Sequence, residues 1–243
     1  MSNRPARVFC ACPLKVGETI ALPLEAARHV QVLRLQPGDA LNLFNGLGGS
    51  HTACVVHMGK HTVHVDVLSH HPEEFESACA THLAIGMPAN ERMDWLVEKA
   101  TELGVARLTP LHTQHTVLRL SAERALKRLA HWHGIAQSAC AQSGRNRIPQ
   151  IDAPLLLSDW VQSLPDSTAQ PRVLLSFQED ARDWRSLWSD PPTSLTVLSG
   201  PEGGLSPDEE HRAKTKGFVP VRLGPRVLRA ETAPLAVLAQ LLP

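Results

Sequence analysis

The sequence predicts an α/β protein in two parts, a small β-rich domain over residues 1–72 and a larger domain over residues 73–243. Up to residue 68, short apolar runs are separated by tight turns, which is typical of a small β-barrel. From residue 81, strand-like runs alternate with helical stretches instead. That alternation favours a mainly parallel sheet covered by helices.

In the first part we expect one helix over residues 24–35 among several strands. Glycine and proline turns separate the apolar runs, as at Pro37-Gly38-Asp39 and Gly59-Lys60. Residues 70–74 are polar and include Pro72, so they are predicted to form a linker. The expected strands are residues 19–22, 40–44, 52–57 and 62–68.

In the second part the longest helix is expected over residues 121–143, with Ser121 as its N-cap. No internal repeat or low-complexity tract interrupts the alternation. The other expected helices are residues 93–103 and 235–242, and the expected strands are residues 81–86, 105–111, 172–177, 195–199 and 218–222.

Charge and composition exclude several classes of protein. The chain has no net charge, with 24 basic and 24 acidic residues, but residues 1–72 hold six Lys/Arg against four Asp/Glu. A locally basic face can attract RNA phosphates. No apolar run is long enough to span a membrane, and the first residues do not resemble a signal peptide. The five cysteines form no Cys-x-x-Cys pair, so we expect reduced thiols and a cytoplasmic location.

A glycine-rich loop follows the expected strand over residues 195–199. The chain then enters a helix with Ser206 at the N-cap, Pro207 at the first position and Glu209 at the third, which predicts a capping box. Glycines at the end of a parallel strand let the backbone approach a ligand. Taken alone, this loop is equally consistent with a tight turn that binds nothing.

A second Gly-Pro loop follows the expected strand over residues 218–222. Because the carboxyl ends of parallel strands meet at one edge of a sheet, the two loops should form the wall of a cleft. Arg226, Arg229 and Glu231 would project from this loop. Glu231 could instead serve the first turn of the last helix, where the helix dipole favours a carboxylate.

Four blocks in this order resemble the 16S ribosomal RNA uracil-N3 methyltransferase family (RsmE) of the SPOUT superfamily. Two of them are the loops, LSGPEGGLSPDE at 198–209 and LGPRVLRAETA at 223–233. The other two are MDWLVEKATELGV at 93–105 and IAQSACAQSGRNRIP at 135–149. The region from Arg28 to Asp39 is also similar, although its pattern is less specific.

The resemblance implies a PUA-like barrel followed by a SPOUT α/β-knot domain with a deep trefoil knot, which ordinary topology rules would not suggest. It also implies a homodimer that binds S-adenosyl-L-methionine (SAM) and methylates N3 of a uridine in 16S rRNA, either as free RNA or in the small ribosomal subunit. The implied cofactor-binding residues are Leu198, Ser199, Gly200, Glu202, Gly203, Gly204, Leu223, Gly224, Val227 and Leu228.

For the reaction, arginines near O2 or O4 of the base could stabilise a developing uracil anion. Arg229 and Arg226 are the first candidates, and Glu231 could orient an arginine. The candidate RNA-binding residues are Arg4, Arg7, Arg28, Arg34, Arg145 and Arg147. The chain departs from the family at Pro88-Ala89-Asn90-Glu91, where a Lys or Arg with Gly is expected, and at His115, which replaces an arginine. These losses of positive charge predict weaker RNA binding at that face.

Three other interpretations of the sequence remain open. The chain could be a SPOUT enzyme with another rRNA or tRNA target, an RNA-binding protein without catalysis, or a nucleotide-phosphate enzyme that uses residues 200–204. The last reading lacks the Lys-Ser/Thr of a P-loop, because Leu205-Ser206 stands there. The histidine pairs 112/115 and 131/133 lack a third ligand at suitable spacing, so we expect no metal.

Overall fold

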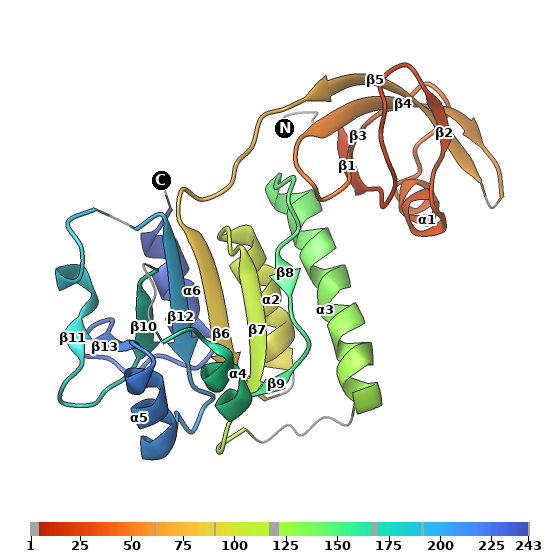
Figure 1. Ribbon diagram of the computed structural model, residues 1–243. Helices are drawn as coiled ribbons and strands as arrows, with labels where there is room; N and C mark the ends of the chain where they lie inside the picture. The colour runs from red at the N-terminus through yellow and green to blue at the C-terminus, as the bar shows by residue number, and fades with distance from the viewer. Residues whose placement is uncertain are drawn as a thin grey trace. The chain divides into compact units, whose positions relative to one another are not determined.

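The computed structural model divides the chain into two compact units (Figure 1). One unit comprises Met1–Glu76 with Gln137–Ile148, and the other comprises Ser77–Ala136 with Pro149–Pro243. Ser121 and Arg4 fall outside the described residues, so the predicted N-cap and one predicted RNA contact carry no structural description. The described residues are 5–60, 62–89, 91–116, 122–166, 170–190 and 192–242.

The N-terminal unit contains a five-stranded sheet in the order β1-β3-β4-β5-β2. Strand β1 runs parallel to β3, and the other neighbours are antiparallel. The predicted strands and helix are present, although the helix ends at Val32 and not at residue 35, and β1 was not predicted. The elements are β1 (Ala6–Phe9), β2 (Thr19–Ala21), α1 (Leu24–Val32), β3 (Ala40–Phe44), β4 (Ser50–Met58) and β5 (Val63–His71).

The linker predicted over residues 70–74 is wrong at its first two positions. His70 and His71 continue β5, where they pair with His51 and Ser50 of β4. Their polarity suggested a linker, but this end of the strand is exposed and can therefore carry polar side chains.

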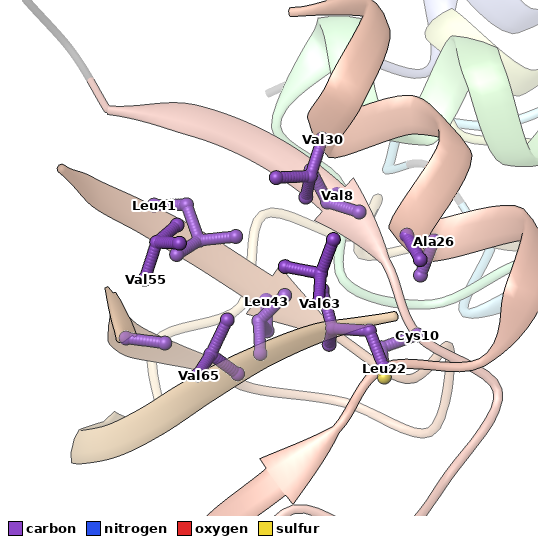
Figure 2. Packing of buried hydrophobic residues seen from close by; sticks show 12 residues of the cluster. Val8, Cys10, Leu22, Ala26, Val30, Leu41, Leu43, Val55, Val63 and Val65 are labelled. Carbon is purple, nitrogen blue, oxygen red and sulfur yellow. The ribbon is translucent and has the colours of Figure 1, made fainter. Parts of the chain in front are cut away.

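One apolar cluster holds the N-terminal unit together (Figure 2). Alternate residues of β3 and β5, such as Leu41, Leu43, Val63 and Val65, are fully buried against Val30 of α1. This alternation follows from the two-residue period of a strand, which sends successive side chains to opposite faces.

The C-terminal unit is built on an eight-stranded, entirely parallel sheet in the order β11-β13-β10-β12-β6-β7-β8, with β9 also paired to β7. The strands are β6 (Ala80–Gly86), β7 (Arg107–His112), β8 (Gln150–Ile151), β9 (Leu155–Leu156), β10 (Arg172–Leu175), β11 (Arg182–Asp183), β12 (Ser194–Ser199) and β13 (Val219–Arg222). The helices are α2 (Glu91–Glu102), α3 (Ala122–Ser143), α4 (Leu157–Ser163), η1 (Trp184–Ser186), α5 (Pro207–Thr215) and α6 (Thr232–Gln240).

Helices cover both faces of this sheet, as the near-continuous apolar runs of its central strands predict. Figure 1 shows α4 and α5 on one side and α2 and α6 on the other. Leu198 of β12 packs with Trp160 of α4 and Ala213 of α5, whereas Val97 of α2 and Val237 of α6 are also buried. The predicted parallel α/β architecture is confirmed. The predicted deep knot is not tested by the strand order and stays a prediction.

His82 should make the stability of the C-terminal unit depend on pH. Burial, with a smaller contribution from Arg107, lowers the pKa of His82 to about 4 from 6.5, although Asp152 opposes the shift. Its Nε2 lies 2.7 Å from Thr109 Oγ1. Between these two pKa values, the histidine is neutral in the folded chain and protonated in the unfolded chain. Its contribution to the free energy of unfolding is therefore complete above pH 6.5 and is progressively lost as the pH falls towards 4.

We therefore expect the free energy of unfolding to fall through this window, by at most about 1.4 kcal/mol per pH unit from this group. Thermal or urea melts of the full chain at several pH values measure the effect. His82→Gln should flatten the dependence, and His29→Gln, at an exposed position of α1, should leave it unchanged. Parallel pH curves for the wild type and His82→Gln would contradict the assignment.

Candidate functional site

A cleft of about 600 Å³ lies at the carboxyl edge of the parallel sheet. The loops after β12 and β13 both line it, and the end of β10, which lies between these strands, forms the part between them. Residues lining the cleft are Arg92, Leu175, Ser176, Phe177, Gln178, Ser199, Gly200, Pro201, Glu202, Gly203, Gly204, Leu205, Glu210, Val221, Arg222, Leu223, Arg226, Val227, Leu228, Arg229, Ala230 and Ala233.

The loop after β12 folds back on itself too closely for side chains. A Cβ at Gly200 would stand 2.7 Å from the carbonyl carbon of Gly204 and 2.8 Å from the Leu205 nitrogen. Gly204 has a φ of +70°, a left-handed conformation that favours glycine. The Gly204 N–H also donates to the Pro201 carbonyl at 2.8 Å. Backbone groups therefore form this wall of the cleft.

The loop is anchored at the start of α5 by the predicted capping box. Ser206 Oγ accepts from the Glu209 N–H at 3.4 Å, and Glu209 Oε2 accepts from the Ser206 N–H at 2.9 Å. The second oxygen of Glu209 accepts from the Gln114 N–H at 2.8 Å. His115 Nδ1 lies 3.2 Å from the Gly204 carbonyl. The histidine that departs from the family pattern thus contacts the glycine loop.

Arg92, at the start of α2, is held at the cleft by two carboxylates. Its Nη1 donates to Glu202 Oε1 at 2.9 Å, and its Nε lies 3.9 Å from Glu231 Oε1. Burial acts to raise the pKa of Glu202, but hydrogen bonds from the Ala89 N–H, its own backbone and Arg92 outweigh it and lower that pKa. Glu202 is therefore a carboxylate at neutral pH.

Glu231 lies just behind this ion pair. Its side chain is 8% exposed, and its Oε2 has no hydrogen-bond partner within the described part of the chain. It stands at the N-cap of α6 but makes no side-chain cap there. An under-satisfied buried carboxylate beside a cationic side chain is typical of a functional site, where stability is given up for chemistry.

Two further arginines reach the cleft from the loop after β13. Arg226 and Arg229 are both exposed, and neither side chain forms an ion pair or hydrogen bond with another described residue. The Arg229 carbonyl accepts from the N–H groups of Thr232 and Ala233, which fixes its backbone at the start of α6. The cleft therefore presents two cations whose donors remain available to a ligand.

Family comparisons agree with this geometry. Residues 75–242 match the model described as an RNA methyltransferase domain, and residues 23–68 match the RNA methyltransferase PUA domain. The ribosomal RNA small subunit methyltransferase E of Synechocystis sp. is 32% identical over 93% of this chain and 73% of that protein. The chain belongs to the ribosomal RNA small subunit methyltransferase E (RsmE) family of the SPOUT superfamily.

Solved structures of similar proteins support the RsmE assignment. A methyltransferase from Legionella pneumophila in complex with SAM has a TM-score of 0.91 and 35% identity, over 98% of this chain and 97% of that one. A ribosomal RNA small subunit methyltransferase E from Neisseria gonorrhoeae bound to SAM has a TM-score of 0.90 and 33% identity, over 98% and 96% of the two chains.

Most of the residues predicted to hold the RsmE cofactor come together in the cleft. Those that line it are Ser199, Gly200, Glu202, Gly203, Gly204, Leu223, Val227 and Leu228. Leu198 is instead fully buried in the core between the sheet and α4, and Gly224 is outside the lining. The side chain of Leu198 can therefore shape the site only through packing.

The sequence prediction missed the contribution of β10 and Arg92. Leu175, Ser176, Phe177 and Gln178 line the cleft after β10, although the run over residues 172–177 was recognised as a strand. No glycine marks this loop, so only its place beside β12 in the sheet identifies it. Burial raises the pKa of Glu210 here, while the Ser176 hydroxyl donates to both its carboxylate oxygens at 3.2 Å and opposes the shift.

The candidate RNA-binding arginines fall into two groups. Arg145 is 4% exposed, and its Nε donates to Glu76 Oε2 at 3.1 Å. Arg7 donates to the Arg145 carbonyl at 3.0 Å and to Asn42 Oδ1 at 3.1 Å. Both guanidinium groups are thus used inside the N-terminal unit, whereas the other described candidates, Arg28, Arg34 and Arg147, are exposed.

Arg145→Ala and Arg147→Ala should separate these groups. Removing Arg145 leaves Glu76 without its buried partner, so we expect a loss of about 3 kcal/mol in unfolding free energy. The Arg147 side chain is 55% exposed, and its Nε lies 3.4 Å from Glu74 Oε1. Its removal should lower the unfolding free energy by less than about 1 kcal/mol. Denaturant melts measure both changes. Equal stability losses for the two variants would contradict the distinction.

Two further features concern the whole described chain. Among its described helices, none is long and apolar enough to cross a bilayer. Within the same residues, no group of three or more His, Cys, Asp or Glu side chains is placed to hold a metal ion. His131 Nε2 lies 2.8 Å from Asp94 Oδ2, and the adjacent Trp132 Nε1 donates to Asp94 Oδ1 at 2.9 Å.

Proposed function

We propose that this chain is a SAM-dependent methyltransferase that methylates N3 of a specific uridine in the 16S rRNA of the small ribosomal subunit. The observation that carries the proposal is the cleft itself. One wall of this cleft is the backbone of the glycine loop, and Arg226 and Arg229 line it without an ion pair or hydrogen bond to another described side chain. Family membership and the SAM-bound RsmE of Neisseria gonorrhoeae support the cofactor and the reaction class.

The cleft fits the parts of SAM. Its volume of about 600 Å³ is in the usual range for small-molecule sites. Leu175, Leu223 and Leu228 offer apolar walls for a flat adenine ring, and the loop over residues 200–204 offers backbone polar groups. Glu202 and Glu210 bring negative charge to a ligand that carries a sulfonium. When bound, SAM supplies an activated methyl group for in-line transfer.

The acceptor side requires groups that favour an anionic base. Uracil N3 carries a proton on its pairing edge, so the base must be unpaired and the proton must leave around the time of attack. Negative charge then develops on O2 and O4. Arg229 and Arg226 would donate hydrogen bonds to those oxygens, where preorganised donors lower the barrier. Glu231 acts as a positioning residue, by holding Arg92 at the cleft.

RNA recognition and assembly complete the proposal. Arg28, Arg34 and Arg147 are the exposed cations through which the N-terminal unit would bind RNA phosphates. We also propose that the chain forms a homodimer with its clefts near the subunit interface and carries the deep trefoil knot of its superfamily. Light scattering of the purified chain measures the oligomeric state, and a monomer at micromolar concentration would contradict the dimer.

Methylation of small ribosomal subunits lacking the modification tests the function directly. Subunits and free 16S rRNA are incubated with the chain and isotope-labelled SAM, digested to nucleosides, and mapped by mass spectrometry. The expected product is 3-methyluridine at one position. Label in transfer RNA or at another atom would replace the proposed substrate, and calorimetry without heat from SAM would remove the enzymatic proposal.

A further inference from the structure

Two cysteine thiols meet at the end of β1, outside the methyltransferase cleft. Cys10 Sγ and Cys12 Sγ lie 2.9 Å apart, which is shorter than the usual contact between two sulfur atoms. The backbone holds them in this position, because the Cys12 N–H donates to the Cys10 carbonyl at 2.7 Å and closes a tight three-residue turn. The Cys10 N–H in turn donates to the Phe44 carbonyl at 2.9 Å, which fixes the turn to β3.

The two thiols differ in environment. Cys10 belongs to the apolar cluster of the N-terminal unit, in which Figure 2 labels it, and it is fully buried. Burial raises the pKa of the Cys10 thiol, and the hydrogen bond and charge of Cys12 raise it further. Cys12 is only partly buried. The buried Cys10 thiol thus keeps its proton, and the more accessible Cys12 thiol is the one that reacts first.

We propose that Cys10 and Cys12 form a redox-active dithiol, which closes to an intramolecular disulfide when the chain meets a small-molecule disulfide such as oxidised glutathione. Residues 10–12 are already turned so that closure needs only a short approach of the two sulfurs. The high effective concentration of a neighbour two residues away favours closure over any intermolecular product.

The chemistry balances in two exchange steps. The Cys12 thiolate attacks one sulfur of oxidised glutathione, which forms a Cys12–glutathione disulfide and releases one glutathione thiolate. The Cys10 sulfur then attacks the Cys12 sulfur and its proton passes to the departing glutathione thiolate, which forms the Cys10–Cys12 disulfide and releases the second glutathione as a thiol. Two protein thiols are oxidised, and one molecule of oxidised glutathione is reduced to two of glutathione.

Quantitative alkylation of the full-length chain tests the proposal. The folded protein is incubated with oxidised glutathione, quenched with acid, denatured, alkylated with N-ethylmaleimide and digested with trypsin. Cleavage after Arg7 and Lys15 gives a peptide over residues 8–15 that contains both thiols and no other cysteine. The expected result is the loss of both alkylation sites and of two hydrogen atoms, with no glutathione retained, and full reversal by dithiothreitol.

Two variants and an internal control make the outcome decisive. Cys10→Ser should trap glutathione on Cys12, whereas Cys12→Ser should leave the buried Cys10 unmodified. Cys54, which is partly buried with no thiol within hydrogen-bond distance, is the internal comparison and can take only a mixed disulfide. Wild-type peptide over residues 8–15 that retains glutathione, or that still takes two maleimides, overturns the proposal.

Discussion

Gly200→Ala should abolish measurable SAM binding at micromolar concentrations, although it adds a single methyl group. The new Cβ would stand 2.7 Å from the Gly204 carbonyl carbon and 2.8 Å from the Leu205 nitrogen, and both are backbone atoms that cannot rotate away. The loop must therefore open, which displaces the wall of the cleft. We expect at least a tenfold rise in the Kd for SAM and a stability loss of about 2 kcal/mol.

Calorimetry with SAM and thermal melts measure these two effects, and Gly134→Ala is the matched control. Gly134 lies in the middle of α3, where a Cβ would meet nothing within 4 Å. Alanine is the better helix former by about 1 kcal/mol, so this variant should be slightly stabilised and should bind SAM normally. Unchanged SAM affinity in Gly200→Ala would place the cofactor somewhere other than against this loop.

Arg229→Ala should reduce turnover by about 100-fold while leaving the melting temperature nearly unchanged. The side chain is exposed in the cleft, and among described residues it has no polar partner that its removal would strand. In the proposed reaction, its loss removes a hydrogen-bond donor to the oxygens on which negative charge develops. Single-turnover methylation of small subunits with saturating SAM measures the change.

Arg185→Ala is the control for a lost positive charge, because Arg185 is exposed on η1 and outside the cleft. Its turnover should stay within about a factor of two of wild type, because solvent and salt screen the effect of an exposed charge outside the cleft. A fall in melting temperature for Arg229→Ala that matches its fall in activity would instead make Arg229 a structural residue.

Local sequence rules predicted most of the fold. The apolar runs predicted β6, β7, β10 and β12, because central parallel strands are largely buried and leave a strong signal. β13 was also predicted from its apolar run, although it is only partly buried. The capping box at Ser206 was also predictable, since it depends on residues three positions apart. The short strands β8, β9 and β11 were missed, because two residues carry no detectable period and exist only through their neighbours in the sheet.

Some residues of the site could likewise be predicted from local sequence, and others could not. Gly200, Gly203 and Gly204 were predictable, because a loop that folds onto its own backbone excludes side chains. Arg92 and the end of β10 reach the cleft only through sheet order and long-range ion pairs, which no local pattern encodes. The burial of Arg145 was not predicted for the same reason. Its carboxylate partner, Glu76, is distant in sequence, and no composition rule shows that a helix-end arginine is buried.

The ion pair between Arg145 and Glu76 has a consequence for biosynthesis. Residues 137–148 belong to the same compact unit as the first sheet, yet they are translated long after its last strand, β5. The segment up to Glu76 therefore leaves the ribosome before residues 137–148 are available to pack against it. It can complete its native contacts only after Ile148 has emerged. Nascent chains arrested before that point should be cleaved by protease within a segment that resists cleavage in the finished protein.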